Sequence, residues 1–147
     1  METISSYMED QHKACDDFFV QAEEAVSVQE WEQAQGSFDA FHQAIEHHFA
    51  QEEGVLFPAI EEVTGSDLGP TQVMRMEHEQ MRGLFSEMKN SLAAGDAEGF
   101  LGAAETLLVL MQQHNTKEEQ IVYPMSEQLL ADRREGILAR LESLGEE

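Results

Sequence analysis

HFAQEEGVLFP, from His48 to Pro58, has a second copy further along the chain, HNTKEEQIVYP. The two segments align without a gap. Each has a histidine first, glutamates four and five positions later, and a proline ten positions after the histidine. In an α-helix, residues four apart lie one turn apart on the same face. Each histidine is therefore expected to lie over a glutamate. The two pairs are His48 with Glu52 and His114 with Glu118.

One histidine lies at the same distance before each segment. His12 lies 36 residues before His48, and His78 lies 36 residues before His114. The chain therefore contains two copies of one unit, a histidine followed by HxxxE, offset by 66 residues. The pattern predicts an internal two-fold pseudo-repeat over about 3–63 and 70–130. It selects six side chains of metal-binding type: His12, His48, Glu52, His78, His114 and Glu118.

Length and charge limit the kinds of partner. The chain has 147 residues, which predicts one domain, 1–147, with 41% hydrophobic residues to form a core. It has 30 acidic residues against 8 basic ones, giving a formal net charge of −22. Because nucleic acids and anionic membrane surfaces repel such a protein, neither is an expected partner. The same charge attracts cations.

The expected location is the cytoplasm. Cys15 is the only cysteine, so it cannot form an internal disulfide, and a reducing compartment follows as the simplest inference. The N-terminal residues do not have the basic and apolar pattern of a signal peptide. The longest apolar run, Leu107–Met111, is far too short to cross a bilayer.

The hydrophobic pattern has a helical period throughout, and no stretch alternates as a strand does. Gly54 and Pro58 are expected to bend or end the second helix, Pro124 the fourth, and Asp96 and Asp132 are candidate N-caps. Thr64–Pro70 is the turn-rich junction between the two units. The prediction is an all-α, antiparallel, up-down-up-down four-helix bundle with a short C-terminal helix. The expected helices are about 3–26, 30–53 with a continuation to 63, 70–94, 97–123 and 132–144.

The two glutamates are expected to face the core. Val55 and Leu56 follow Glu52, and Ile121 and Val122 follow Glu118 at the same spacing. Burial and mutual repulsion are expected to raise the pKa of both carboxyl groups in the absence of metal. A lone inward histidine is usually a core residue bonded to a carbonyl, and most glutamates lie on the surface, so a purely structural polar core is the rival interpretation. The matched set of six favours a metal site, because unpaired buried carboxylates cost several kcal/mol.

The ligand types indicate which metal. Four imidazoles and two carboxylates can hold two metal ions, with each glutamate bridging the pair and each metal taking two histidines. Such a set, without thiolate, suits iron, manganese or zinc, and iron is expected because helical bundles commonly house di-iron centres. A ligand role is conceivable for Cys15, one turn from His12, but a small buried hydrophobe is the expected role.

The repeat also assigns expected roles to four further residues, and the sequence suggests a role for Arg82. Glu53 and Glu119 occupy matched positions rotated off the ligand face, and they are expected to partner the ligands or to face solvent. Tyr123 and Phe57 also occupy one repeat position and are expected to pack at the bundle end. Arg82 is expected to pair with a carboxylate near the site or to form a helix-surface ion pair.

The motifs resemble those of the hemerythrin-like family, the HHE cation-binding domain, from His12 to about Leu130. They are HFxxEExxLFP, HxxxEExxxYP and the EHxxxR string at Glu77–Arg82. The resemblance implies a four-helix bundle holding two non-haem irons with bridging carboxylates and an oxo or hydroxo bridge. It implies that one iron takes His12 and His48, that the other takes His78 and His114, and that Glu52 and Glu118 bridge them.

The sequence departs from the oxygen-carrying members of that family at Met74. The carriers have a fifth histidine one turn before the third-helix histidine, where this chain has Met74, matched by Met8 before His12. The expected function is therefore binding of dioxygen, peroxide or nitric oxide with redox turnover. An oxygen-storage or sensing module and an iron-handling protein are the alternatives. The sequence identifies no protein partner.

Overall fold

The structure, a computed structural model, describes residues 2–66 and 69–145. These residues form a bundle of helices without a strand, which confirms the all-α class. The expected junction Thr64–Pro70 contains Asp67 and Leu68, which lie outside the described residues. The α-helices are α1 (Ile4–Ser27), α2 (Trp31–Gln51), α3 (Phe57–Thr64), α4 (Pro70–Ala93), α5 (Ala97–Lys117), α6 (Tyr123–Leu129) and α7 (Arg134–Gly145).

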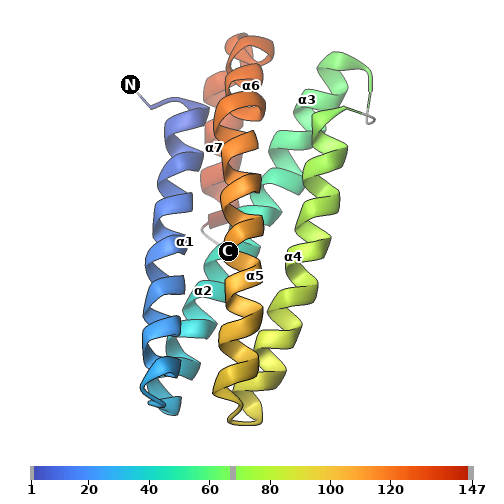
Figure 1. The fold of residues 1–147 in the computed structure, drawn as a ribbon. Helices are drawn as coiled ribbons and strands as arrows, with labels where there is room; N and C mark the ends of the chain where they lie inside the picture. The colour runs from blue at the N-terminus through green and yellow to red at the C-terminus, as the bar shows by residue number, and fades with distance from the viewer. Residues whose placement is uncertain (1, 67–68, 146–147) are drawn as a thin grey trace.

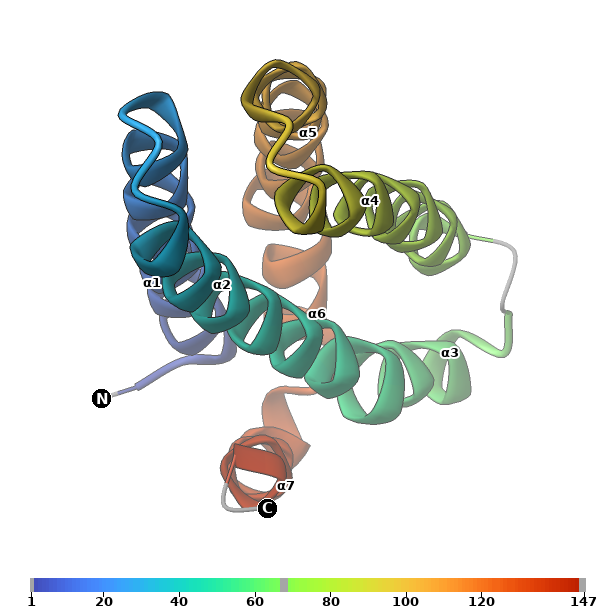
Figure 2. The same ribbon diagram turned by 90° about the horizontal axis from the view of Figure 1, so that it is seen from below.

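Long helices give the molecule its shape. In Figure 1 the chain descends along α1, rises through α2 and α3, descends along α4 and rises through α5 and α6. The helix α7 then turns back along the outside of the bundle. Seen along the bundle, α1 lies beside α2 and α4 beside α5, while α7 is set apart from the four long helices (Figure 2).

Side chains at the starts of α1 and α5 accept hydrogen bonds from free backbone N–H groups. The side chain of Thr3 accepts a hydrogen bond from the Ser6 N–H in a capping box, and α4 begins at Pro70. Asp96 caps α5 as expected, accepting a hydrogen bond from the Gly99 N–H at 2.9 Å. The expected cap at Asp132 is wrong, because Asp132 lies within the short 3₁₀ turn η3 (Ala131–Arg133) that precedes α7.

Two π-helical segments replace the expected breaks. They are η1 (Glu52–Leu56), which joins α2 to α3, and η2 (Glu118–Val122), which joins α5 to α6. Pro58 and Pro124 are the second residues of α3 and α6 and lie just after the π segments, so neither proline ends its helix. The wider π turn accommodates a proline ring that would clash with a carbonyl in a regular α-helix.

One matched pair of positions in the two π segments differs in exposure. Val55, Leu56 and Val122 are buried as expected, but Ile121 is 54% exposed. The expectation for Ile121 is therefore wrong. Its counterpart Val55 in η1 is buried because α7 packs against η1 and adds Ile137 and Leu141 to the same part of the core.

The apolar core has two parts. One is rich in phenylalanine and includes Phe41 and Phe85, whose rings meet edge to face at 5.7 Å. The other lies toward α3, α6 and α7 and includes Met8, Met74 and Tyr123. His12 lies between Met8 and Cys15 along α1, so the six polar residues of the repeated motif lie where the two parts of the core meet.

Candidate metal centre

The structure brings together all six side chains that the sequence selects. The histidines come from four helices, α1, α2, α4 and α5, while Glu52 and Glu118 are the first residues of η1 and η2. None of the six residues is more than 5% exposed. The HxxxE spacing acts locally: it places each glutamate one turn beyond its histidine on the inward face.

The six residues form two overlapping groups whose candidate ligand atoms lie within 4.8 Å of one another. Glu52 and Glu118 belong to both groups, as carboxylates that bridge two metals must. In the first group, the Nε2 atom of His12 lies 3.0 Å from a Glu118 oxygen. In the second, the Nε2 atom of His78 lies 3.0 Å from a Glu52 oxygen. The groups are His12, His48, Glu52 and Glu118, and His78, His114, Glu52 and Glu118.

The outer nitrogen, Nδ1, of each imidazole is hydrogen-bonded to a polar side chain. The Nδ1 atom donates outward to an oxygen in every case, which turns the Nε2 lone pair toward the centre. Proteins fix metal-binding histidines in this way. The four pairs are His12 with Glu119 at 2.7 Å, His48 with Gln11 at 2.8 Å, His78 with Glu53 at 2.6 Å and His114 with Glu77 at 2.7 Å.

Basic side chains neutralise two of these supporting carboxylates. Arg82 donates to Glu53 at 3.1 Å and to Glu46 at 3.0 Å, and Lys117 pairs with Glu77. Burial opposes ionisation of Glu53, but the hydrogen bonds from His78 and Arg82 lower its pKa to about 2. Glu53 and Glu119 thus contact candidate ligands, and Arg82 pairs with a carboxylate near the site, each in one of its two expected roles.

The sequence did not single out Gln11 or Glu77 as partners of ligands. The sequence contained one hint of this role: Glu77 lies 66 residues after Gln11, so the two occupy matching positions of the repeat.

Two buried atoms at the centre have no hydrogen-bond partner. They are Nε2 of His114 and Oε2 of Glu118, which lie 3.3 Å apart. A buried polar atom without a partner costs about 1–3 kcal/mol, and more when it is charged. A metal ion bound between them would satisfy both atoms, so the residues present fit a cation.

The charges at the centre are strongly coupled. Burial and then the charge of Glu118 raise the pKa of Glu52. Burial opposes ionisation of Glu118 as well, but the hydrogen bond from Glu52 and the nearby imidazoles hold its pKa well below the usual value. The expectation that both pKa values rise is therefore wrong for Glu118. Burial disfavours the charged form of His114, yet Glu118 and Glu52 raise its pKa to about 9.

Tyr123 lies at the centre of the site, which corrects the expectation that it packs at the bundle end. Its hydroxyl donates to Glu52 at 2.7 Å and lies 3.0 Å from a Glu118 oxygen. Burial, followed by these two carboxylates, raises the pKa of Tyr123 well above the usual value. Phe57, the other member of the repeat position, is fully buried with its ring 5.7 Å from that of His78.

A hollow of about 500 Å³ between α1 and α5 reaches the site from the surface. A separate small cavity lies deeper, beside His48 and His114. The residues that line both are His12, Asp16, Met111 and Asn115. Cys15 also lines the inner cavity, and burial raises the pKa of its thiol to about 12, as for a small buried hydrophobe.

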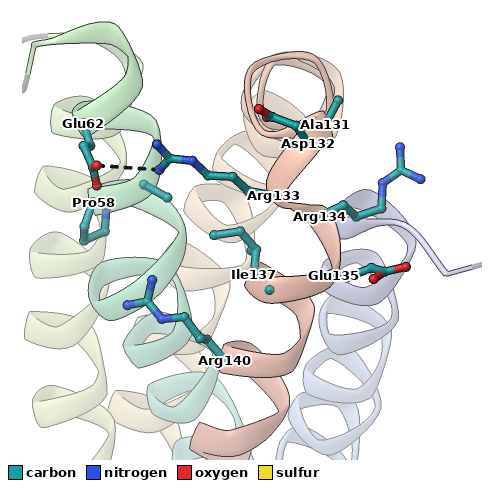
Figure 3. Close-up of a pocket in the computed structure, with 11 residues that line it drawn as sticks. Pro58, Glu62, Ala131, Asp132, Arg133, Arg134, Glu135, Ile137 and Arg140 are labelled. Atoms are coloured by element: carbon teal, nitrogen blue, oxygen red, sulfur yellow. Dashed lines mark ion pairs between the residues drawn. The ribbon is translucent and has the colours of Figure 1, made fainter.

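Another hollow, of about 770 Å³, lies away from the site, between α3, η3 and α7. Figure 3 shows its arginines, of which Arg133 pairs with Glu62 at 3.7 Å. It contains none of the six candidate ligands.

Comparison with known proteins agrees with the geometry. Residues 3–126 match the family model described as the hemerythrin HHE cation binding domain. No curated protein and no solved structure matches the chain. None of the helices in 2–66 and 69–145 has the length and apolar character needed to cross a membrane. Because the matched segment covers most of the chain and contains all six clustered side chains, the protein belongs to the hemerythrin HHE cation-binding domain family.

Proposed function

We propose that this protein binds two non-haem iron ions and uses them to react with dioxygen or peroxide. The ligands are the six clustered side chains. His12 and His48 hold one iron, His78 and His114 hold the other, and the two glutamates bridge them together with an oxo or hydroxo group. The observation that carries the proposal is that the two candidate groups share both carboxylates while every imidazole turns Nε2 inward.

The donor set supports iron over other metals. Nitrogen and carboxylate oxygen without thiolate suit iron, with manganese and zinc as less favoured occupants. A bound iron pair supplies two metals that can exchange electrons with a small oxidant. The protein contributes charge balance, since the anionic glutamates offset the metal charge, and it contributes fixed orientation through Glu53, Glu77 and Glu119.

We propose that small ligands approach through the hollow between α1 and α5. Met111 and Asn115 line both the hollow and the inner cavity, and the inner cavity has a volume of about 10 Å³, which suits molecules of a few atoms. Asp16 at the same place disfavours anions, which makes neutral dioxygen, hydrogen peroxide and nitric oxide the fitting ligands.

Met74 favours turnover over reversible carriage. Met74 and Met8 are both buried one turn before a candidate ligand histidine, and neither thioether offers the strong nitrogen donor that a further histidine would. A centre with fewer protein ligands leaves more room for a reacting molecule. Oxygen storage or sensing, and iron handling, are the alternative functions.

We also propose that the chain is one domain, 1–147, built from two pseudo-repeated units in an antiparallel bundle. The residues that support the candidate ligands also obey the 66-residue offset, which favours a repeated unit. Gln11 and Glu77 both support the histidine of the following HxxxE segment, and Glu53 and Glu119 both support a histidine of the other unit.

The test begins with metal content and the optical spectrum of protein loaded with ferrous iron and exposed to air. Two irons per chain are expected, falling to none in the Glu52→Ala, Glu118→Ala double variant. The matched control is Glu87→Ala, an exposed glutamate on α4, which should keep two irons. Two irons in the double variant would contradict the bridging roles.

The reduced protein is then exposed to oxygen, and the gas is removed. Oxidation that does not reverse, together with consumption of added peroxide, supports the redox function. An oxygenated spectrum that returns fully to the reduced state without peroxide consumption would support storage or sensing instead. Rapid loss of iron to a mild chelator, with neither reaction, would support iron handling.

A further inference from the structure

The hydroxyl oxygen of Tyr123 lies close to all four side chains of one candidate group. These are the four side chains proposed to surround the first metal. Its Oη atom is 2.7 Å from a Glu52 oxygen and 3.0 Å from a Glu118 oxygen. It is also 3.1 Å from the His12 Nε2 atom and 3.4 Å from the His48 Nε2 atom.

These distances match the spacing of atoms that share a metal ion. Nitrogen and oxygen ligands lie about 2.1 Å from a metal, so two ligands at a right angle are roughly 3.0 Å apart, and two opposite ligands roughly 4.2 Å apart. The Nε2 atoms of His12 and His48 are 3.1 Å apart. The Nε2 atom of His48 lies 3.9 Å from the nearer Glu118 oxygen. The Tyr123 oxygen therefore has right-angle spacing to all four, as a fifth donor on one side of the group would.

The second group has a phenylalanine where the first has Tyr123. Phe57 precedes Tyr123 by 66 residues and occupies the matching repeat position, with its ring 5.7 Å from that of His78. A phenyl ring offers no donor atom. The pseudo-symmetry around the six candidate ligands is therefore broken at this pair of positions.

We propose that Tyr123 is a ligand of the metal held by His12 and His48, and that the metal held by His78 and His114 has no such ligand. The inference rests on the proposed metal site. When the Tyr123 oxygen binds, its O–H bond breaks, the oxygen keeps the electron pair and donates it to the metal, and the proton passes to solvent. The hydrogen bond to Glu52 is lost, which frees that carboxylate oxygen to bind the metal.

The consequence is that the two metals differ. An anionic phenol oxygen stabilises the higher charge of an oxidised metal, so the iron beside Tyr123 is expected to be the harder one to reduce. Stepwise reduction in two separate one-electron stages follows from this difference.

The test uses the visible spectrum of the intact protein loaded with ferric iron. A phenol oxygen bound to ferric iron gives a visible charge-transfer band, and laser excitation within that band enhances the tyrosine ring vibrations in the Raman spectrum. Both signals are expected in the parent protein. Tyr123→Phe should lose both while retaining bound iron. The control is Tyr7→Phe, since Tyr7 is the only other tyrosine and its hydroxyl accepts from Gln51; it should keep both signals.

A calorimetric titration with Zn²⁺ gives an independent measurement. Tyr123→Phe should weaken one of the two binding events by about tenfold or more and leave the other as in the parent, because only one metal loses a ligand. Equal weakening of both events would contradict the assignment to one metal.

Parent protein that binds two ferric ions but lacks the tyrosine Raman signal overturns this inference alone and leaves the metal site in place. Parent protein that binds no metal overturns both. Because the Raman signal is measured on the parent, the test remains decisive even if the variant fails to fold.

Discussion

Removing the metal should make the stability of this protein fall as pH rises from about 6.5 to 9. The reason is the set of buried imidazoles beside buried carboxylates. Burial disfavours the charged form of these imidazoles, but hydrogen bonds and charges from Glu118 or Glu52 raise the pKa values of His12, His78 and His114. A histidine whose folded pKa lies above its unfolded value stabilises the fold below the unfolded pKa. That contribution is lost as pH rises through the folded pKa.

The pKa shift of His114 gives the expected size of the stability change. Its pKa rises from 6.5 to about 9, and its side chain is 2% exposed, so solvent screening is small. Each pKa unit corresponds to about 1.4 kcal/mol, so His114 alone stabilises the metal-free fold by about 3 kcal/mol below pH 6.5, all of which is lost above pH 9. The raised pKa of Glu52 acts in the same direction. The lowered pKa of Glu118 acts only in acid, where its contribution is lost as pH falls.

The assay is urea unfolding of chelator-treated protein at several pH values between 5 and 9. The free energy of unfolding is expected to be highest at about pH 5 to 6.5 and to fall by about 3 kcal/mol or more by pH 9. Metal-loaded protein should show the opposite trend, because the ligands bind metal in their deprotonated forms. His42→Gln, which changes a histidine outside the site, should keep the slope of the parent. Metal-free stability that is constant or rising between pH 6.5 and 9 would refute the reasoning.

Three substitutions test other parts of the structure. Glu53→Gln should weaken metal binding by about 10- to 100-fold, measured by competition with a chelator, because the acceptor for His78 loses its charge; the exposed Glu105→Gln should have no effect. Phe41→Ala should lower the free energy of unfolding by about 3–5 kcal/mol, since its ring is fully buried, and a loss under 1 kcal/mol would contradict its place in the core. Asp96→Ala should cost about 1 kcal/mol by removing the cap of α5, and an unchanged urea midpoint would count against that cap.

The sequence by itself determined the helices and the candidate ligands. Both follow from local geometry: apolar residues at helical spacing give the buried faces, and HxxxE places a carboxylate one turn from an imidazole. His12 and His78 were added to the candidate ligands because His12 lies as far before His48 as His78 lies before His114. These inferences need only the residues along one helix and the comparison of the chain with itself.

The tertiary structure decided what surrounds those ligands. Gln11 and Glu77 lie one residue before His12 and His78, yet each supports a histidine of another helix, a pairing fixed by how neighbouring helices pack. Ile121 faces solvent while its repeat counterpart Val55 is buried, because α7 packs against η1. The Tyr123 hydroxyl lies among side chains of α1, α2, η1 and η2. A pattern along one helix does not show which other elements surround a position. The backbone had to be known before the oxygen of Tyr123 could be placed among four candidate ligands.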